Sequence, residues 1–451
     1  MTVDLTAHVP DTREQVSLRA GASRVSSATL STLAMALLTL LAALQLLIWV
    51  KAIEGRGGLD AYARHIDFAA TLTGALIVHD GDGARLYDLD TQRAAQERVL
   101  APYITPKAES VLPYIHPPFE ALLVAPLVGL SYGLLYALWS GLIVLALAAS
   151  LVLLARTLPV AGSARWVLLA AIGSYGALYQ VLWLGQSSPL VLLGLCGTYA
   201  GIKRRRDSWA GAALALMALK PQMLLVIALL LLMWRRWRAL AVCGGILAGL
   251  SVAAMPVLGL LWPLHYARFL AGIPTWGGSH HEYPAIMHNW RGLAFNLLGE
   301  ALPWSQGPIV AGLTIGALLG LVWAWWHSSN GEGTDCDLLW AAGCVVAILI
   351  APHLYLHDLT LLIFPAWIVV AQRATRVWRA SLAHLWLGLL WSVHLLAILF
   401  LLIADSRPAL PVVPTIVLIA VAGGLLILRG SNLGVVARDC AARPPPSVPG
   451  E

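Results

Sequence analysis

The sequence predicts an all-α protein that crosses a membrane many times, and three observations predict it. Of the 451 residues, 59% are hydrophobic and only 12% are charged, whereas a soluble domain has about 25% charged residues. The apolar residues form runs of about 20, the length that a helix needs to cross a bilayer. Short basic clusters separate these runs. This composition excludes a disordered chain, which has low hydrophobicity and high charge, and an ordinary soluble enzyme.

The chain begins with a polar cytoplasmic tail, residues 1–27, and an apolar run follows over about 28–50. This run is too long for the core of a signal peptide and lacks a cleavage site of small residues. We therefore expect a retained helix whose N-terminus lies inside. The long polar stretch over about 51–116 is then expected outside.

Clusters of lysine and arginine orient the remaining runs, because such clusters accumulate on the cytoplasmic side of a membrane. Between them we expect helices near residues 133–155, 165–184, 188–202, 239–262, 308–327, 338–352, 358–371, 383–403 and 411–429. Lys220-Pro221 interrupts residues 207–234, so two short helices are expected there, with Lys220 near the outer tip. Residues 117–130 are apolar but only about 14 long, which suits a re-entrant or interfacial element as well as a span.

These elements form one multi-spanning domain over residues 28–429, with about twelve helices (between about 10 and 13) and both termini inside. A second external stretch is expected over about 263–307, and a disordered cytoplasmic tail over 430–451. The net charge of +6 does not indicate a nucleic-acid partner, because the basic residues are dispersed between apolar runs. The expected surroundings of this chain are a lipid bilayer.

Unusual polar residues gather on the outer side in this topology. They lie in residues 65–68 with 86–88, 114–118, 185–189, 279–291 and 352–358. Eight of the thirteen histidines fall on these external stretches: His65, His79, His116, His280, His281, His288, His353 and His357. This asymmetry indicates a functional site on the outer side.

Each polar feature also has a structural interpretation. Asp67 could be a helix N-cap, and His357-Asp358 could be a cap pair at the positive end of a helix dipole. Lys220 could extend to the membrane interface, although a lysine between apolar runs is costly in lipid. Gly185-Gln186 could simply end a helix. The histidines form no HExxH pattern, so no metal and no cofactor are expected.

Several motifs occur in an order that resembles glycosyltransferase family 87, the membrane mannosyltransferases that use polyprenyl-phosphate mannose. They are Asp67-Phe68, Leu86-Tyr87-Asp88, the aromatic-x-His-Pro-Pro-Phe stretch over residues 114–119, Gly-Gln-Ser-Ser-Pro over 185–189, Leu-Lys-Pro-Gln over 219–222, Arg-Arg-Trp-Arg-Ala over 235–239 and the late turn from Pro352 to His357. The resemblance implies a C-type glycosyltransferase in a bacterial inner membrane. Such an enzyme moves a sugar, by family mannose, to a hydroxyl of a glycolipid or glycan acceptor, at a site that faces the periplasm or the cell exterior.

The resemblance and the chemistry together suggest roles for individual residues. A glycosyl phosphate carries a good leaving group, so the enzyme needs a base for the acceptor hydroxyl rather than an acid. We expect Asp67 to be this base, with His357 beside it by family position, and inversion at the anomeric carbon. The leaving phosphate needs cationic donors, for which the candidates are Lys220, Arg291, Arg64 and His281. His353, Gln186, His116 and Tyr87 are expected to bind the acceptor or the sugar.

Two other functions compete with this interpretation. A transporter or flippase of a polar or lipid-linked substrate would place its ionisable residues near the midplane and show repeated halves, and Lys220-Pro221 is the one feature that suits it. An O-antigen-type ligase would rely on basic residues and histidines more than on Asp67. Neither explains the gathering of polar residues on outer loops as well as a glycosyltransferase does.

Overall fold

The computed structural model describes residues 27–64, 66–101, 112–272, 284–299, 302–329, 336–372 and 412–430, and the regular elements in these ranges are all helices. Five helices are long and apolar enough to cross a membrane: Thr32–Gly55, Tyr132–Thr157, Ala164–Leu184, Trp237–Leu258 and Ser305–His327. Six more apolar helices have 10–17 residues. A polytopic membrane protein fits this architecture, while the number of about twelve spans stays a prediction. The helix expected over 383–403 and both terminal tails lie outside the described residues.

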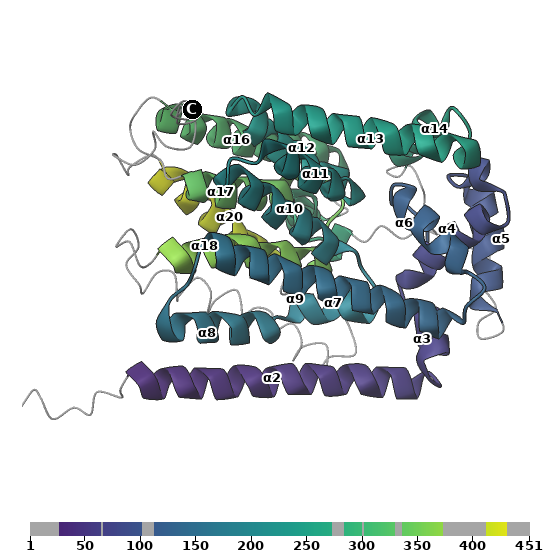
Figure 1. Cartoon of the computed structure of the whole chain (residues 1–451), viewed down its shortest axis with the longest axis horizontal. Coiled ribbons are helices and arrows are strands. Elements are labelled where there is room, and N and C mark those ends of the chain that lie inside the picture. Colours follow the sequence, from purple (N-terminus) through teal and green to yellow (C-terminus); the bar gives the residue numbers. More distant parts are fainter. Residues whose placement is uncertain are drawn as a thin grey trace, which may run out of the picture.

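The first quarter of the chain contains one long helix and a group of short ones. Helix α2 (Ser27–Gly55) lies along one side of the bundle, and α3 (Leu59–Arg64), α4 (Phe68–His79), α5 (Leu89–Leu100) and α6 (Phe119–Val124) gather at one end of it (Figure 1). The polar stretch expected over 51–116 therefore contains helices, and ten consecutive residues of α4 are buried. Residues 117–130 form only α6 and the 3-10 turn η2 (Ala125–Leu127), which are too short to span a bilayer.

The remaining elements complete the bundle, and the longest of them lie side by side (Figure 1). They are α7 (Tyr132–Thr157), α8 (Gly162–Gly173), α9 (Gly176–Leu184), α10 (Ser188–Lys203), α11 (Asp207–Leu216), η3 (Met217–Leu219), α12 (Pro221–Met233), α13 (Trp237–Leu258), α14 (Trp262–Gly272), η5 (Pro284–Ile286), α15 (Trp290–Leu298), α16 (Pro303–Ser329), α17 (Cys336–Ile350), η6 (Leu356–Leu362), α18 (Ile363–Gln372) and α20 (Val412–Gly430). The expected interruption at Lys220-Pro221 is confirmed, because Pro221 opens α12, where its missing N–H is not needed.

Two groups of buried apolar side chains hold the bundle together. The larger one lies around α10, α12, α17 and α18 and includes Trp340 and Trp367, while the smaller one lies around α4, α6 and α7 and includes Phe68 and Trp139. The apolar side chains of α2 remain largely exposed, as expected of a helix that contacts lipid on most of its surface. The residues of the candidate site come from segments that belong to both groups.

A buried carboxylate joins three helices at the end of the bundle opposite α4. Asp337, at the start of α17, accepts hydrogen bonds from the Tyr199 hydroxyl (2.7 Å) and the Gln372 amide (2.9 Å). The ammonium group of Lys203 lies 2.5 Å from the same carboxylate. Because Tyr199 and Lys203 belong to α10 and Gln372 to α18, this cluster fixes the ends of all three helices.

Replacing Asp337 should therefore destabilise the fold. Asp337→Ala leaves the buried Tyr199 and Gln372 donors without their acceptor, and we expect a loss of about 2 kcal/mol, which is less than for a fully buried ion pair because Lys203 can turn to solvent. Chemical unfolding in detergent micelles measures it. Asp90→Ala is the matched control, because its carboxylate is 83% exposed; an equal loss in both variants would contradict the assignment.

Candidate functional site

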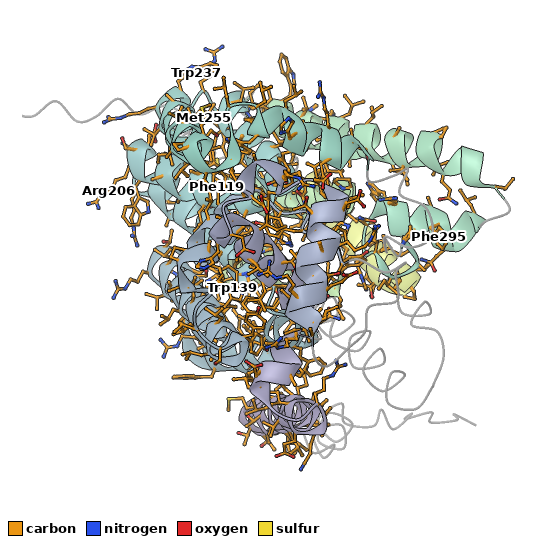
Figure 2. The ribbon with its side chains drawn as sticks, turned by 90° about the vertical axis from the view of Figure 1, so that its right-hand side faces the viewer. Phe119, Trp139, Arg206, Trp237, Met255 and Phe295 are labelled. Atoms are coloured by element: carbon orange, nitrogen blue, oxygen red, sulfur yellow. The ribbon has the colours of Figure 1, made fainter. Side chains whose placement is uncertain are left out.

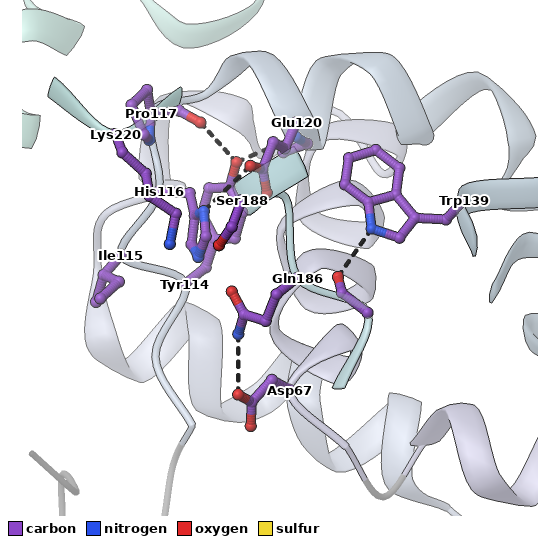
Figure 3. A network of polar contacts seen from close by, with 12 residues as sticks. Asp67, Tyr114, Ile115, His116, Pro117, Glu120, Trp139, Gln186, Ser188 and Lys220 are labelled. Carbon is purple, nitrogen blue, oxygen red and sulfur yellow. Dashed lines mark hydrogen bonds and ion pairs between the residues drawn. The ribbon is translucent and has the colours of Figure 1, made fainter. Parts of the chain in front are cut away.

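Asp67 stands at the N-terminus of α4, yet its carboxylate does not cap that helix. Instead, Oδ2 of Asp67 accepts a hydrogen bond of 2.9 Å from the side-chain amide of Gln186 (Figure 3). The two residues are 119 positions apart in the sequence. The Asp67 side chain thus contacts Gln186 instead of the backbone of its own helix. The N-cap interpretation does not account for this side chain.

Gly185 makes this contact possible. It ends α9 in the left-handed conformation, with φ of 71°, which favours glycine. A Cβ atom on Gly185 would lie 2.8 Å from Cβ of Phe68, so a larger residue would separate Gln186 from α4. The indole N–H of Trp139 donates to the Gly185 carbonyl at 2.8 Å and fixes the turn from α7. Gly185 therefore both ends a helix and allows a close approach.

The surroundings of Asp67 change its acidity. Burial raises the pKa of this carboxyl above its usual value, and the Gln186 hydrogen bond and the charges of His116, His353 and Lys220 offset only part of that effect. A carboxylate with a raised pKa is a better proton acceptor than a solvated one. Asp67 thus has the environment of a general base.

The segment that carries His116 lies beside Gln186 (Figure 3). Nδ1 of His116 lies 3.2 Å from Oε1 of Glu120, four residues later on α6. Burial opposes the charge of Glu120, but the charge and hydrogen bond of His116, with smaller contributions from Ser187 and Lys220, hold the Glu120 pKa below its usual value. The Tyr87 hydroxyl donates to the His116 carbonyl at 3.0 Å, so Tyr87 positions this segment.

Lys220 forms a buried ion pair with Asp358, and the Ser188 hydroxyl donates to the same Asp358 oxygen at 2.7 Å. The Lys220 side chain is only 9% exposed, so it does not extend to the membrane interface. Oδ2 of Asp358 also accepts the backbone N–H of Tyr355 at 3.3 Å, which is a helix-capping bond. The capping interpretation of Asp358 is thus correct, but it covers only part of what this carboxylate contacts.

His357 lies deeper than expected. It is 4% exposed, and its Nε2 lies 3.6 Å from Oδ2 of Asp358. Its Nδ1 is buried and has no hydrogen-bond partner among the described residues. Asp358, Lys220 and His353 supply the largest charge effects on His357, whereas those on Asp67 come from His116, His353 and Lys220. His353 is therefore the histidine of the late turn that is electrostatically coupled to Asp67.

Residues 288–291 pack against the late turn. The backbone N–H of His288 donates to the Leu354 carbonyl at 2.9 Å, and the Asn289 amide donates to the Ala351 carbonyl at 2.8 Å. A guanidinium nitrogen of Arg291 lies 3.4 Å from the Pro352 carbonyl. These contacts bring Arg291 to the turn that carries His353.

Arg64 is held by partners on α3, α5 and α7. Its guanidinium donates to Asp60 (3.1 Å) and to the carbonyls of Val99 (2.8 Å) and Ala101 (2.6 Å). It also stacks on the Tyr132 ring, with the guanidinium carbon 4.2 Å from the ring centroid. Arg64 thus ties α3 to the end of α5. His65, His280 and His281 lie outside the described residues.

The site contains three residues that the sequence did not single out as candidates: Glu120, Ser188 and Asp358. Glu120 stands four residues after His116, but His116 precedes α6, so the spacing of residues along a helix did not reveal this pair. Ser188 belongs to the Gly-Gln-Ser-Ser-Pro stretch, in which only Gln186 was chosen. A helix cap was one interpretation of Asp358 that the sequence left open, and only tertiary contacts reveal its bond to Lys220.

Comparison with known proteins gives one match. The family model described as glycosyltransferase family 87 matches residues 114–352, slightly more than half of the chain. The matched region includes His116, Gln186, Lys220 and Arg291. Asp67 and the late turn over 353–358 fall outside it and join it through the contacts described above. The curated proteins and the solved structures gave no match.

Gly185→Ala should destabilise the protein and disturb the Asp67–Gln186 contact. A left-handed alanine costs about 1–2 kcal/mol, and the new Cβ also meets Phe68 at 2.8 Å. We therefore expect a loss of more than about 2 kcal/mol in chemical unfolding. Gly129→Ala serves as the control, since a Cβ there meets nothing within 4 Å. Equal stability of the Gly185 variant and the wild type would contradict this role.

Proposed function

Because the chain belongs to glycosyltransferase family 87, we propose that it transfers a sugar, mannose by family precedent, from a polyprenyl-phosphate carrier to a hydroxyl of a glycolipid or glycan on the extracytoplasmic side of a bacterial membrane. The observation that carries the proposal is the half-buried Asp67 carboxylate, held by Gln186 at 2.9 Å and influenced by the charges of His116, His353 and Lys220. Such a group suits the removal of one proton from an attacking hydroxyl.

The reaction is a single displacement. The acceptor oxygen attacks the anomeric carbon, and its proton passes to Asp67. The bond between the anomeric carbon and the phosphate oxygen breaks, and the polyprenyl phosphate departs with the electron pair. Attack opposite the leaving group inverts the anomeric centre. Gln186 occupies Oδ2 of Asp67, so we assign the proton to Oδ1, and release of this proton to water restores the base.

Basic residues around Asp67 suit the leaving phosphate. The Lys220 ammonium has three donor hydrogens, and its ion pair with Asp358 leaves donors for a second anion. Arg291, beside Pro352, adds a guanidinium that can bind two phosphate oxygens. We therefore assign the phosphate to Lys220 and Arg291. Arg64 is given a structural role instead, because its guanidinium already binds Asp60 and two carbonyls, and His281 remains a candidate outside the described residues.

The histidines divide between two tasks in this scheme. His353 is assigned to Asp67, since its charge acts on that carboxylate and His116 is already engaged by Glu120. His357 is assigned to Asp358, 3.6 Å away, where it supports the group that fixes Lys220. This assignment replaces the pairing of Asp67 with His357 that family position suggested. Gln186, which binds Asp67, and His116 and His353, whose charges act on it, are assigned to the sugar or the acceptor.

Asp67→Asn should abolish transfer, with a decrease of at least about 100-fold, because an amide of the same shape cannot accept the proton. The assay uses membranes, radiolabelled polyprenyl-phosphate mannose and a native lipid extract as acceptor. Asp90→Asn, a change at an exposed carboxylate, should retain full activity. Substantial activity of the Asp67 variant would show that another group is the base. No product from the wild type with any polyprenyl-phosphate sugar would favour transport, and lipid-linked substrate flux would then be measured.

Gln186→Leu should move the acid limb of the rate profile to higher pH. Only the ionised carboxylate accepts a proton, so transfer is lost as the pH falls through the Asp67 pKa. The Gln186 hydrogen bond favours the ionised form, and its removal raises this pKa further, so the rate falls at a higher pH than in the wild type. Transfer rates measured across the pH range test this. A pH profile of the Gln186→Leu variant that equals that of the wild type would exclude Asp67 as the titrating group.

A further inference from the structure

Two turns at the end of the bundle opposite Asp358 share an unusual backbone. Residues 204–206 connect α10 to α11, and residues 234–236 connect α12 to α13. Arg205 (φ 57°) and Arg235 (φ 55°) are the non-glycine residues with positive φ among those that the structure describes. Both turns close with the same bond, from the next N–H to the carbonyl five residues earlier, at 2.8 Å: Arg206 to Gly201 and Arg236 to Leu231.

Glycine is the usual residue at this position, because an L side chain in the left-handed conformation is strained. Arginine at both positions is therefore retained against a conformational cost. A turn that needed only to end a helix would be more stable with glycine. Strain that recurs at two matching positions points to a function for the side chains.

The guanidinium groups of these turns are largely unneutralised. Four exposed arginines in the turns, and one just after them on α13, form no ion pair and no side-chain hydrogen bond within the described part of the chain: Arg204, Arg205, Arg206 and Arg235, and Arg238. The neighbouring Arg236 instead lies 3.6 Å from Asp207 and so connects the two turns. The two turns thus present their positive charges as one surface, which we call the arginine surface.

Close helix packing fixes the backbone beneath the arginine surface. A Cβ atom on Gly201 would lie 2.8 Å from the backbone N of Ala210, and one on Gly211 would lie 2.3 Å from the carbonyl of Ala239. Helices α10, α11 and α13 therefore meet backbone to backbone next to both turns. This packing fixes the backbone of the turns that carry the arginines, so binding an anion needs no ordering of that backbone, which favours binding.

Two tryptophans locate the arginine surface relative to the membrane. Trp209 and Trp237 follow the two turns and are each 59% exposed, and Trp237 begins one of the candidate spans. In the end-on view, the Arg206 side chain points away from the edge of the bundle, and Trp237 also lies at the edge (Figure 2). Exposed tryptophans of this kind occupy the headgroup level of a bilayer. The guanidinium groups then lie at the level of the lipid phosphates.

We propose that the arginine surface binds the phosphate groups of anionic membrane lipids. Guanidinium groups bind phosphate oxygens in pairs, and each basic residue near an anionic leaflet adds to the attraction. This site is distinct from that of the sugar donor. Asp358 accepts from Ser188 at the start of α10, and the arginines follow its other end, 16 residues or about 24 Å away. The site does not depend on the function proposed above.

The test compares the full-length wild type with Arg205→Gly/Arg235→Gly in phosphatidylcholine micelles, with and without added phosphatidylglycerol. The wild type should show a Tm that rises with phosphatidylglycerol. The variant should be at least as stable as the wild type in phosphatidylcholine alone, because glycine relieves the strain, and should lose more than half of the rise. A purely structural role of these arginines predicts no such loss. An equal rise in both proteins would overturn the proposal.

Further variants isolate the charge. Arg205→Gln/Arg235→Gln keeps the backbone strain but loses the charge, and it should also lose the response to phosphatidylglycerol, whereas Arg205→Lys/Arg235→Lys should keep most of it. Arg165→Gln is the matched control, because Arg165 lies outside these turns, where its guanidinium carbon is 4.8 Å from the Trp166 ring centroid. This variant should respond to phosphatidylglycerol as the wild type does. The assignment to lipid would be overturned if inorganic phosphate raised the Tm as much as phosphatidylglycerol does. It would also be overturned if a soluble acidic peptide raised the Tm and phosphatidylglycerol did not.

Discussion

The buried pair of Lys220 and Asp358 is the interaction on which the arrangement of the site depends. Removing a charge from water costs several kcal/mol, and the pair repays this only if both groups are fixed in good geometry. Ser188 supplies the additional hydrogen bond to Asp358. The three residues come from the start of α10, the start of α12 and the turn after α17, so this cluster sets how these segments meet. His353 and His357 lie on the turn that the pair secures, and their positions follow from it.

Two carboxylates of the site have pKa values that are shifted in opposite directions, and their neighbours explain the difference. Asp67 receives one amide hydrogen bond and distant positive charges, so burial dominates and its pKa rises. Glu120 contacts the His116 ring directly, so its pKa falls in spite of burial. Groups with divergent pKa values in one site suit different tasks. Asp67 is suited to take up a proton, whereas Glu120 remains charged and holds His116.

Helices α10 and α12 share the same features at their two ends. Each begins with a polar residue and a proline, Ser188-Pro189 and Lys220-Pro221, and each ends at a turn with a left-handed arginine. The Asp358 carboxylate lies at both N-termini, where the helix dipole favours an anion, and the arginines follow both C-termini, where it favours cations. The helix dipole therefore stabilises the charged groups at both ends of α10 and α12. The length of these helices separates the proposed catalytic side from the arginine surface.

Composition and the spacing of apolar runs determined that this chain is a helical membrane protein, because lipid requires continuous apolar helices whatever their neighbours. They also located the interruption at Lys220-Pro221, since proline acts on the backbone locally. The order of the motifs indicated the family, and the family model agrees over residues 114–352. The sequence could not show that residues 51–116 contain buried helices, because polar residues flank the short apolar run of α4. Nor could it show that Gln186 binds Asp67, that Lys220 binds Asp358 or that Arg64 is occupied by carbonyls. Those partners are 35 to 138 residues apart, so only the packing of the bundle decides which side chains meet.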